Sequence, residues 1–131
     1  MWLTVDPRSH TPMYQQIIDD IKERIARGVL TPASRLPSIR ELAMDLTINP
    51  NTIAKAYQEL EREGVIEVVR GKGTFVGQPA GAPVHAASWT TVRELLTKAL
   101  VEAHHTGLAV ADVARELERL IGEWEQEGTR T

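Results

Sequence analysis

Residues 36–76 read LPSIRELAMDLTINPNTIAKAYQELEREGVIEVVRGKGTFV, and this stretch decides the fold. It contains two short helical patterns separated by a tight break, and then two β-branched runs that flank a glycine-rich turn. Polar and basic residues gather at the start of the second helical pattern and at the turn, with apolar residues behind both. The stretch therefore predicts a winged helix-turn-helix, a mainly α fold with a small β-hairpin.

The first helical pattern begins after Ser38. Serine is a preferred N-cap, and Glu41 three residues later completes a capping box. We expect the buried face of this helix to consist of Ile39, Leu42, Ala43 and Leu46. Arg40 points away from that face in the first turn, where the helix dipole disfavours a cation. A phosphate contact would explain this arginine, and so would a solvated or salt-bridged side chain.

The second helical pattern begins at Asn49-Pro50, an N-cap followed by a residue suited to the first turn, and runs to about Glu63. Its inward positions are Ile53, Ala56, Tyr57 and Leu60, and its outward positions are Asn51, Thr52, Lys55 and Gln58. In a helix-turn-helix, the second helix enters the major groove by its N-terminal end. There asparagine bonds adenine, threonine contacts the thymine methyl group and lysine reaches guanine or phosphate. An ordinary solvated helix face carries the same residue types, so this pattern alone leaves both interpretations open.

A hairpin follows Gly64, which ends the helix. Its strands are the β-branched residues of 65–69 and the return Thr74-Phe75-Val76, and its tip is Arg70-Gly71-Lys72-Gly73. Glycines permit the positive φ angles of a tight turn. A slim tip with two cations can approach a phosphate backbone or enter a minor groove. The alternative is a soluble hairpin whose charges prevent edge pairing. Beside a helix-turn-helix, the DNA interpretation is favoured.

The N-terminal segment adds a scaffold helix. Residues 1–11 are expected to be extended, with Thr11 as N-cap and Pro12 as the first helical residue. An apolar stripe follows at helical spacing, formed by Tyr14, Ile17, Ile18, Ile21 and Ile25. Gly28 ends the helix. We expect residues 29–35 to form a loop around Thr31-Pro32.

The C-terminal part predicts a helical hairpin. Residues 79–87 contain prolines and glycine among alanines and are interpreted as a linker, with helices at about 88–105 and 110–124 on either side of Thr106-Gly107. Two helices alone bury too little surface to be stable. Their stripes must cover the first domain or a second subunit, and we favour a second subunit. The residues assigned to this dimerisation face are Val92, Leu95, Leu96, Ala99, Val113, Leu117, Leu120, Ile121 and Trp124.

Composition limits the function. The 131 residues include no cysteine, which excludes disulfides and thiolate metal sites. Neither a signal-peptide pattern nor an apolar run of about 18 residues is present, so we expect a cytoplasmic protein. Residues 1–78 carry 10 basic and 10 acidic side chains, which sum to zero, and residues 79–131 carry 5 and 8, which sum to −3. DNA binding then requires the basic groups to share one face, since phosphate attraction is local.

The order of motifs resembles the GntR family of bacterial transcription regulators. Five spaced motifs within residues 7–77 carry the resemblance: PMYQQI at 12–17, LPS at 36–38 with RELA at 40–43, NPNT at 49–52 with Ala56-Tyr57, Leu60-Glu61 with Gly64, and GKGTFV at 71–76. Family members are winged helix-turn-helix proteins that bind palindromic operators as dimers. One departure is Ala33, where the family has glycine after the proline, and we expect that loop to be less tightly turned.

The resemblance also implies residue roles. Arg40 matches a phosphate- or base-contacting arginine, Asn51 and Thr52 match recognition-helix contacts, and residues 70–72 match the wing tip. The full set assigned to DNA is Ser38, Arg40, Asn49, Asn51, Thr52, Lys55, Arg70, Gly71 and Lys72. The 54 residues after Gly77 (131 minus 77) are too few for a large effector-binding domain. Such a tail resembles the YtrA subfamily, whose members are usually dimeric repressors of transporter operons and of their own operon.

The expected organisation is therefore a DNA-binding domain at 1–78, a linker at 79–87 and a dimerisation tail at 88–131. No catalytic motif, cofactor site or membrane segment is expected. His105 shares a helix face only with Glu102, and two ligands do not close a metal site. If a small-molecule effector binds, we expect it between the two domains or at the dimer interface. The alternative function is a winged-helix protein-interaction module that does not bind DNA.

Overall fold

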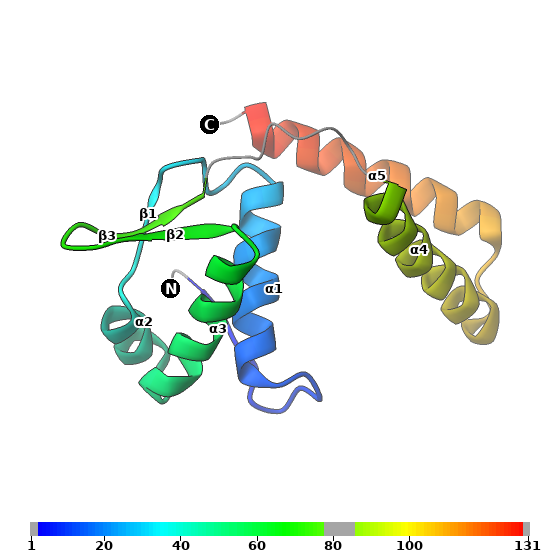
Figure 1. The fold of residues 1–131 in the computed structure, drawn as a ribbon. Coiled ribbons are helices and arrows are strands. Elements are labelled where there is room, and N and C mark those ends of the chain that lie inside the picture. Colours follow the sequence, from blue (N-terminus) through cyan, green and yellow to red (C-terminus); the bar gives the residue numbers. More distant parts are fainter. Residues whose placement is uncertain (1–2, 78–85, 130–131) are drawn as a thin grey trace. The chain divides into compact units, whose positions relative to one another are not determined.

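The computed structural model describes residues 3–77 and 86–129. The chain divides into two compact units, residues 1–79 and residues 80–130. The first unit contains α1 (Met13–Ala26), β1 (Arg35–Leu36), α2 (Ile39–Leu46), α3 (Pro50–Arg62), β2 (Ile66–Val69) and β3 (Gly73–Val76). The second contains α4 (Ala86–Thr106) and α5 (Val110–Thr129). In Figure 1 the helices of the first unit lie together with the sheet at one end, which confirms the predicted winged helix-turn-helix.

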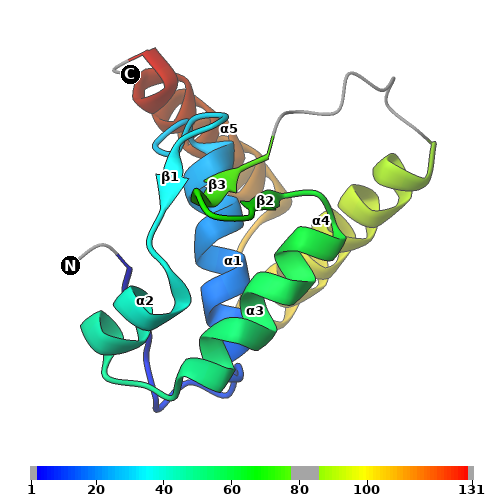
Figure 2. The ribbon, with the colours of Figure 1, turned by 60° about the vertical axis from the view of Figure 1, so that its left-hand side comes forward.

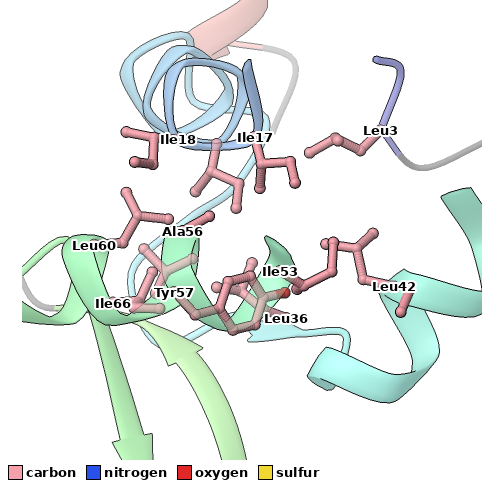
Figure 3. Close-up of a cluster of buried hydrophobic side chains, with 13 residues drawn as sticks. Leu3, Ile17, Ile18, Leu36, Leu42, Ile53, Ala56, Tyr57, Leu60 and Ile66 are labelled. Carbon is pink, nitrogen blue, oxygen red and sulfur yellow. The ribbon is translucent and has the colours of Figure 1, made fainter. Parts of the chain in front are cut away.

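The core of the first unit lies between α1, α3 and the sheet. Ile17, Ile18 and Ile21 of α1 meet the predicted inward residues of α3, and Leu36, Ile66 and Val76 of the three strands complete the cluster. Figure 3 shows how side chains from separate elements converge there, including Leu3 from the N-terminal segment. Leu42 and Ala43 are buried as predicted. Ile39 is not: it is 37% exposed, because a side chain at the first helical position tilts beyond the helix end.

The start of α1 differs from the prediction. Its N-cap is Pro12, whose ψ of 149° keeps it outside the helix, and no side chain caps the end. Thr11 is therefore not the cap. Gln16 instead fastens the preceding segment: its Nε2 donates to the carbonyls of Asp6 and Thr11, both at 2.9 Å, and its Oε1 accepts from the Asp6 N–H at 2.7 Å.

The sheet contains a strand that the sequence did not reveal. The strand order is β1-β3-β2, with both pairings antiparallel. β1 begins at the last residue of the loop predicted at 29–35, and it aligns Arg35 with Phe75 and Leu36 with Thr74. The β2–β3 hairpin aligns Ile66 with Val76 on the buried side. The wing is thus a three-stranded sheet attached to α2 through β1.

The loop before β1 also corrects an expectation. The Ser34 N–H donates to the Thr31 carbonyl at 3.1 Å, which closes a turn with Pro32 and Ala33 at its centre. Ala33 has φ +67°, the left-handed conformation that such a turn requires at its third residue. The turn is therefore not loosened by the absence of glycine, and the alanine adopts the conformation that glycine would adopt.

The second unit is a hairpin of two long helices that pack against each other. Gly107, at φ +81°, ends α4, and the Leu108 N–H donates to the Ala103 carbonyl at 2.9 Å. Both helices extend past the predicted ends. Most of the linker predicted at 79–87 lies outside the described residues. Its last two positions, 86 and 87, belong to α4. Among the described helices, none is long and apolar enough to cross a membrane.

Candidate nucleic-acid interface

Side chains cap the N-terminal ends of α2 and α3. The Ser38 hydroxyl accepts from the Glu41 N–H at 3.1 Å, and Asn49 Oδ1 accepts from the Asn51 N–H at 2.8 Å. Both polar atoms are thereby engaged by the backbone of their own helix. Ser38 and Asn49, which we had assigned to DNA, have a visible positioning role here. Between the helices, Thr47 ends α2 in the left-handed conformation with φ 55°.

Tyr57 links α3 to the segment that precedes α2. Its ring is buried in the core, and its hydroxyl donates to the Pro37 carbonyl at 2.8 Å. Burial, with a smaller contribution from the charge of Glu41, raises the pKa of Tyr57 well above its usual value. The phenol stays neutral and keeps its donor, so both packing and a hydrogen bond hold α3 against the segment that precedes α2.

The outward residues near the starts of α2 and α3 are accessible to a binding partner. Arg40 and Asn51 are exposed, and Thr52 is half-buried beside them. In Figure 1 the α2–α3 turn and the hairpin tip lie on the same side of the first unit, and α1 lies on the other. Figure 2 brings that side forward, with α1 behind α3 and the hairpin. The fold therefore presents the first turns of α2 and α3 together with the wing.

Lys55 is placed differently from the other outward residues. Its Nζ lies 3.9 Å from the centre of the Tyr14 ring, a cation–π contact between α3 and the first turn of α1. The two side chains border an open depression of about 530 Å³ together with Gln15, Gln58, Glu59 and Arg62. Sequence reasoning found the outward position of Lys55 but missed its partner, because contacts between separate helices leave no local pattern.

The wing tip is a tight turn with two exposed cations. Gly71 has φ +77° and Gly73 has φ +129°, and the Lys72 N–H donates to the Val69 carbonyl at 3.0 Å. Arg70 and Lys72 extend from this turn into solvent. The turn carries no acidic residue, so its local charge is positive although the chain as a whole is acidic.

Cations of the first unit fall into two groups. Four form ion pairs along α1 and the end of α3: Lys22–Glu63 at 3.2 Å, Arg24–Asp20 at 2.6 Å, Arg27–Glu23 at 3.7 Å, and Arg62–Glu59. The Arg62 hydrogen bond also lowers the pKa of Glu59. Within residues 3–77 no ion pair is recorded for Arg8, Arg35, Arg40, Lys55, Arg70 or Lys72. Apart from Arg8 and Lys55, these unpaired cations belong to the wing and α2.

Comparison with known proteins agrees with this geometry. The family described as bacterial regulatory proteins of the gntR family matches residues 13–76. The transcriptional repressor YtrA of Bacillus subtilis is 43% identical over 125 residues, which cover 95% of this chain and 90% of that protein. The chain belongs to the GntR family, and within it to the YtrA subfamily. Because the relatives are transcriptional regulators, the expectation that the chain is not an enzyme is confirmed.

Two solved structures extend the comparison. A transcriptional antiterminator from Listeria monocytogenes EGD-e superposes with a TM-score of 0.78 at 34% identity, covering 90% of this chain and 88% of that chain. Coverage of this extent includes the C-terminal helices as well as the winged unit. The DNA-binding domain of AraR in complex with operator ORX1 superposes with a TM-score of 0.51 at 32% identity, covering 57% of this chain and 93% of that one. The second comparison places this winged fold on operator DNA in a relative.

Proposed function

We propose that this GntR-family protein is a sequence-specific DNA-binding regulator that acts in the cytoplasm as a homodimer and represses its own operon and a transporter-type operon. The observation that carries the proposal is the group of unpaired cations on the wing and α2, beside the exposed start of α3. The operon targets derive from similarity to YtrA-type repressors. In this proposal residues 1–78 read DNA and residues 88–131 form the dimer.

Base readout is assigned to the start of α3. Asn51 is exposed in the first turn, and its amide can bond adenine in the major groove, while Thr52 offers a methyl group to thymine. Arg40, one helix away, supplies a phosphate contact that fixes the register. Arg70 and Lys72 approach the flanking backbone or minor groove, with Gly71 allowing close approach. Lys55 joins them when it leaves the Tyr14 ring.

Two copies are needed for tight binding. Residues 1–78 have zero net charge, so one winged unit makes few phosphate contacts. A dimer places two α3 helices on half-sites about 34–36 Å apart, or a small shift from that, and palindromic DNA matches the two-fold axis. The apolar side chains of α4 and α5 supply a surface for this pairing, since several are 38–62% exposed in the single chain: Val92, Leu95, Leu96, Leu117, Ile121 and Trp124.

The decisive experiment is a gel shift with duplex fragments from upstream of the protein's own gene. The proposal expects a shifted band at low salt that weakens as salt rises. Asn51→Ala should cost about 1–3 kcal/mol at one base position and remove discrimination there. Arg40→Ala is the matched variant, because losing a phosphate contact weakens binding uniformly across sequences and lowers the salt slope. An Asn51→Ala protein that retains full discrimination overturns the base-readout assignment.

The competing function is a protein-interaction module. The exposed apolar side chains of α4 and α5 would also suit a different protein partner. The same gel shift separates the two functions. If a chain that is folded by circular dichroism shifts no fragment at low salt, the regulator proposal is wrong and the protein-interaction module is favoured.

A further inference from the structure

Arg35 lies at the wing although it is 35 residues before the hairpin tip in sequence. It is the first residue of β1, and the antiparallel pairing with β3 sets it opposite Phe75. On strand β3 the same face of the sheet continues, two residues on, to Gly73 at the base of the tip. The sheet therefore carries a third cation to the hairpin that already holds Arg70 and Lys72.

The Arg35 side chain lies next to Gly73. A methyl group added at Gly73 would lie 3.4 Å from Nε of Arg35 and 3.8 Å from Nη2. The guanidinium thus lies beside Gly73, within van der Waals reach of the place that a Cβ atom would take. A side chain that lies along the sheet in this way is already directed toward the wing tip, and such orientation lowers the entropy cost of binding a phosphate.

The charge of Arg35 is not neutralised within the sheet. Glu67 is the one acidic residue of the hairpin, and it stands opposite Phe75 on the far side of β3 from Arg35. Two strand spacings, about 10 Å, separate the two positions, with the phenylalanine between them. No ion pair of Arg35 is recorded within residues 3–77, and its side chain is exposed.

We infer that Arg35 is a DNA-contacting residue of the wing, whose guanidinium binds a backbone phosphate next to the one reached by the tip. The inference rests on the proposed function and adds a contact outside the hairpin itself. The planar guanidinium suits two phosphate oxygens at once, which a lysine does not match. The alternative role is structural, with Arg35 supporting the hairpin or keeping the β1 edge from pairing.

The test measures salt dependence, which counts phosphate contacts. The full chain and its variants Arg35→Gln, Arg35→Lys and Lys22→Gln are titrated onto a labelled 30-bp mixed-sequence duplex at several salt concentrations, by fluorescence anisotropy. Arg35→Gln should reduce the slope of log affinity against log salt by about 0.9 per bound protomer and weaken binding roughly eight-fold at 0.1 M salt. Arg35→Lys should keep the slope but bind more weakly than the native chain.

Lys22→Gln is the matched control, because it removes one positive charge from the same unit at an ion pair on the α1 side. It should leave the slope unchanged. An unchanged slope for Arg35→Gln, or an equal fall for Lys22→Gln, overturns the inference while DNA binding stands. A weaker affinity with native slope and a lower melting temperature assigns Arg35 the structural role instead. If the native chain binds no duplex at low salt, the proposed function fails along with it.

Discussion

Ala33 holds a strained conformation in the turn before β1. Its φ of +67° costs a residue with a Cβ atom about 1–2 kcal/mol relative to the right-handed region. Glycine relieves that strain but gains freedom in the unfolded chain worth about 0.4–1 kcal/mol. We expect Ala33→Gly to raise the free energy of unfolding by about 0.5–1 kcal/mol, measured by urea denaturation. Ala54→Gly, inside α3, is the control and should destabilise the protein by a similar amount.

Tyr57 donates a hydrogen bond whose contribution to the free energy of unfolding depends on pH. Tyr57→Phe keeps the ring and loses the bond to the Pro37 carbonyl, so it should lower the free energy of unfolding by about 1 kcal/mol at pH 7. Because folding raises the Tyr57 pKa, the unfolded chain releases its phenolic proton first, from about pH 10. Below about pH 10 the hydroxyl is protonated in both states, so its ionisation leaves the free energy of unfolding unchanged. Above that pH the free energy of unfolding falls by up to about 1.4 kcal/mol per pH unit.

The phenylalanine variant lacks this titration. Urea denaturation at pH 7, 9 and 10.5 should therefore show the two proteins converging as the pH rises above about 10. Every other side chain is the same in the two proteins, so only the Tyr57 hydroxyl contributes to the difference in their free energies of unfolding. A stability difference that is constant across this range would contradict a raised pKa for Tyr57.

At the scale of elements, the residue that follows β3 packs against the backbone that follows α3. The Gly77 N–H donates to the Val65 carbonyl at 2.8 Å, and a methyl group at Gly77 would lie 2.5 Å from the Gly64 carbonyl oxygen. Backbone atoms cannot move aside as a flexible side chain can. Gly77→Ala should therefore cost about 1–3 kcal/mol, as overpacking does in a core, and displace the hairpin relative to α3.

Thermal unfolding checks the Gly77→Ala cost, and the gel shift checks whether a displaced wing weakens DNA binding. Gly64→Ala is the control for added bulk, since a methyl group there meets nothing within 4 Å and only the positive φ is strained. If Gly77→Ala is no less stable than the native chain, the close approach between wing and helix is not a constraint in solution.

Prediction of these elements from the sequence succeeded where the pattern is local. The apolar spacing of α1 and α3, the caps Ser38 and Asn49, and the glycines of the hairpin each act within a few residues. β1 could not be found this way, because two residues have no periodicity and the strand exists only through its pairing with β3. The Lys55–Tyr14 contact and the place of Arg35 were missed for the same reason.

At the scale of the whole molecule, the proposed dimer depends on the C-terminal helices α4 and α5. Its helices were predicted from their apolar stripes, but the partner of those stripes does not follow from one chain's sequence, because exposed leucines suit any apolar surface. In the single chain Leu117 is 42% exposed and Ile121 is 49% exposed, on one face of α5. That exposed face needs a covering surface, and the proposed function assigns this role to a second copy of the chain.

Placing a charge in this stripe tests the dimer directly. We expect Leu117→Asp combined with Ile121→Asp to yield a monomer in sedimentation, because an unpaired carboxylate buried at an apolar interface costs several kcal/mol. Arg115→Asp, about 120–160° from these positions around α5, changes the charge by the same amount away from the stripe and should remain dimeric. The winged unit should keep its melting temperature in both variants, while the monomer loses the avidity of two linked sites and requires about 100-fold more protein for a gel shift. If the protein with the charged stripe remains a dimer, the interface lies elsewhere, and sedimentation of a chain truncated after Gln78 would then tell whether the winged unit itself forms the dimer.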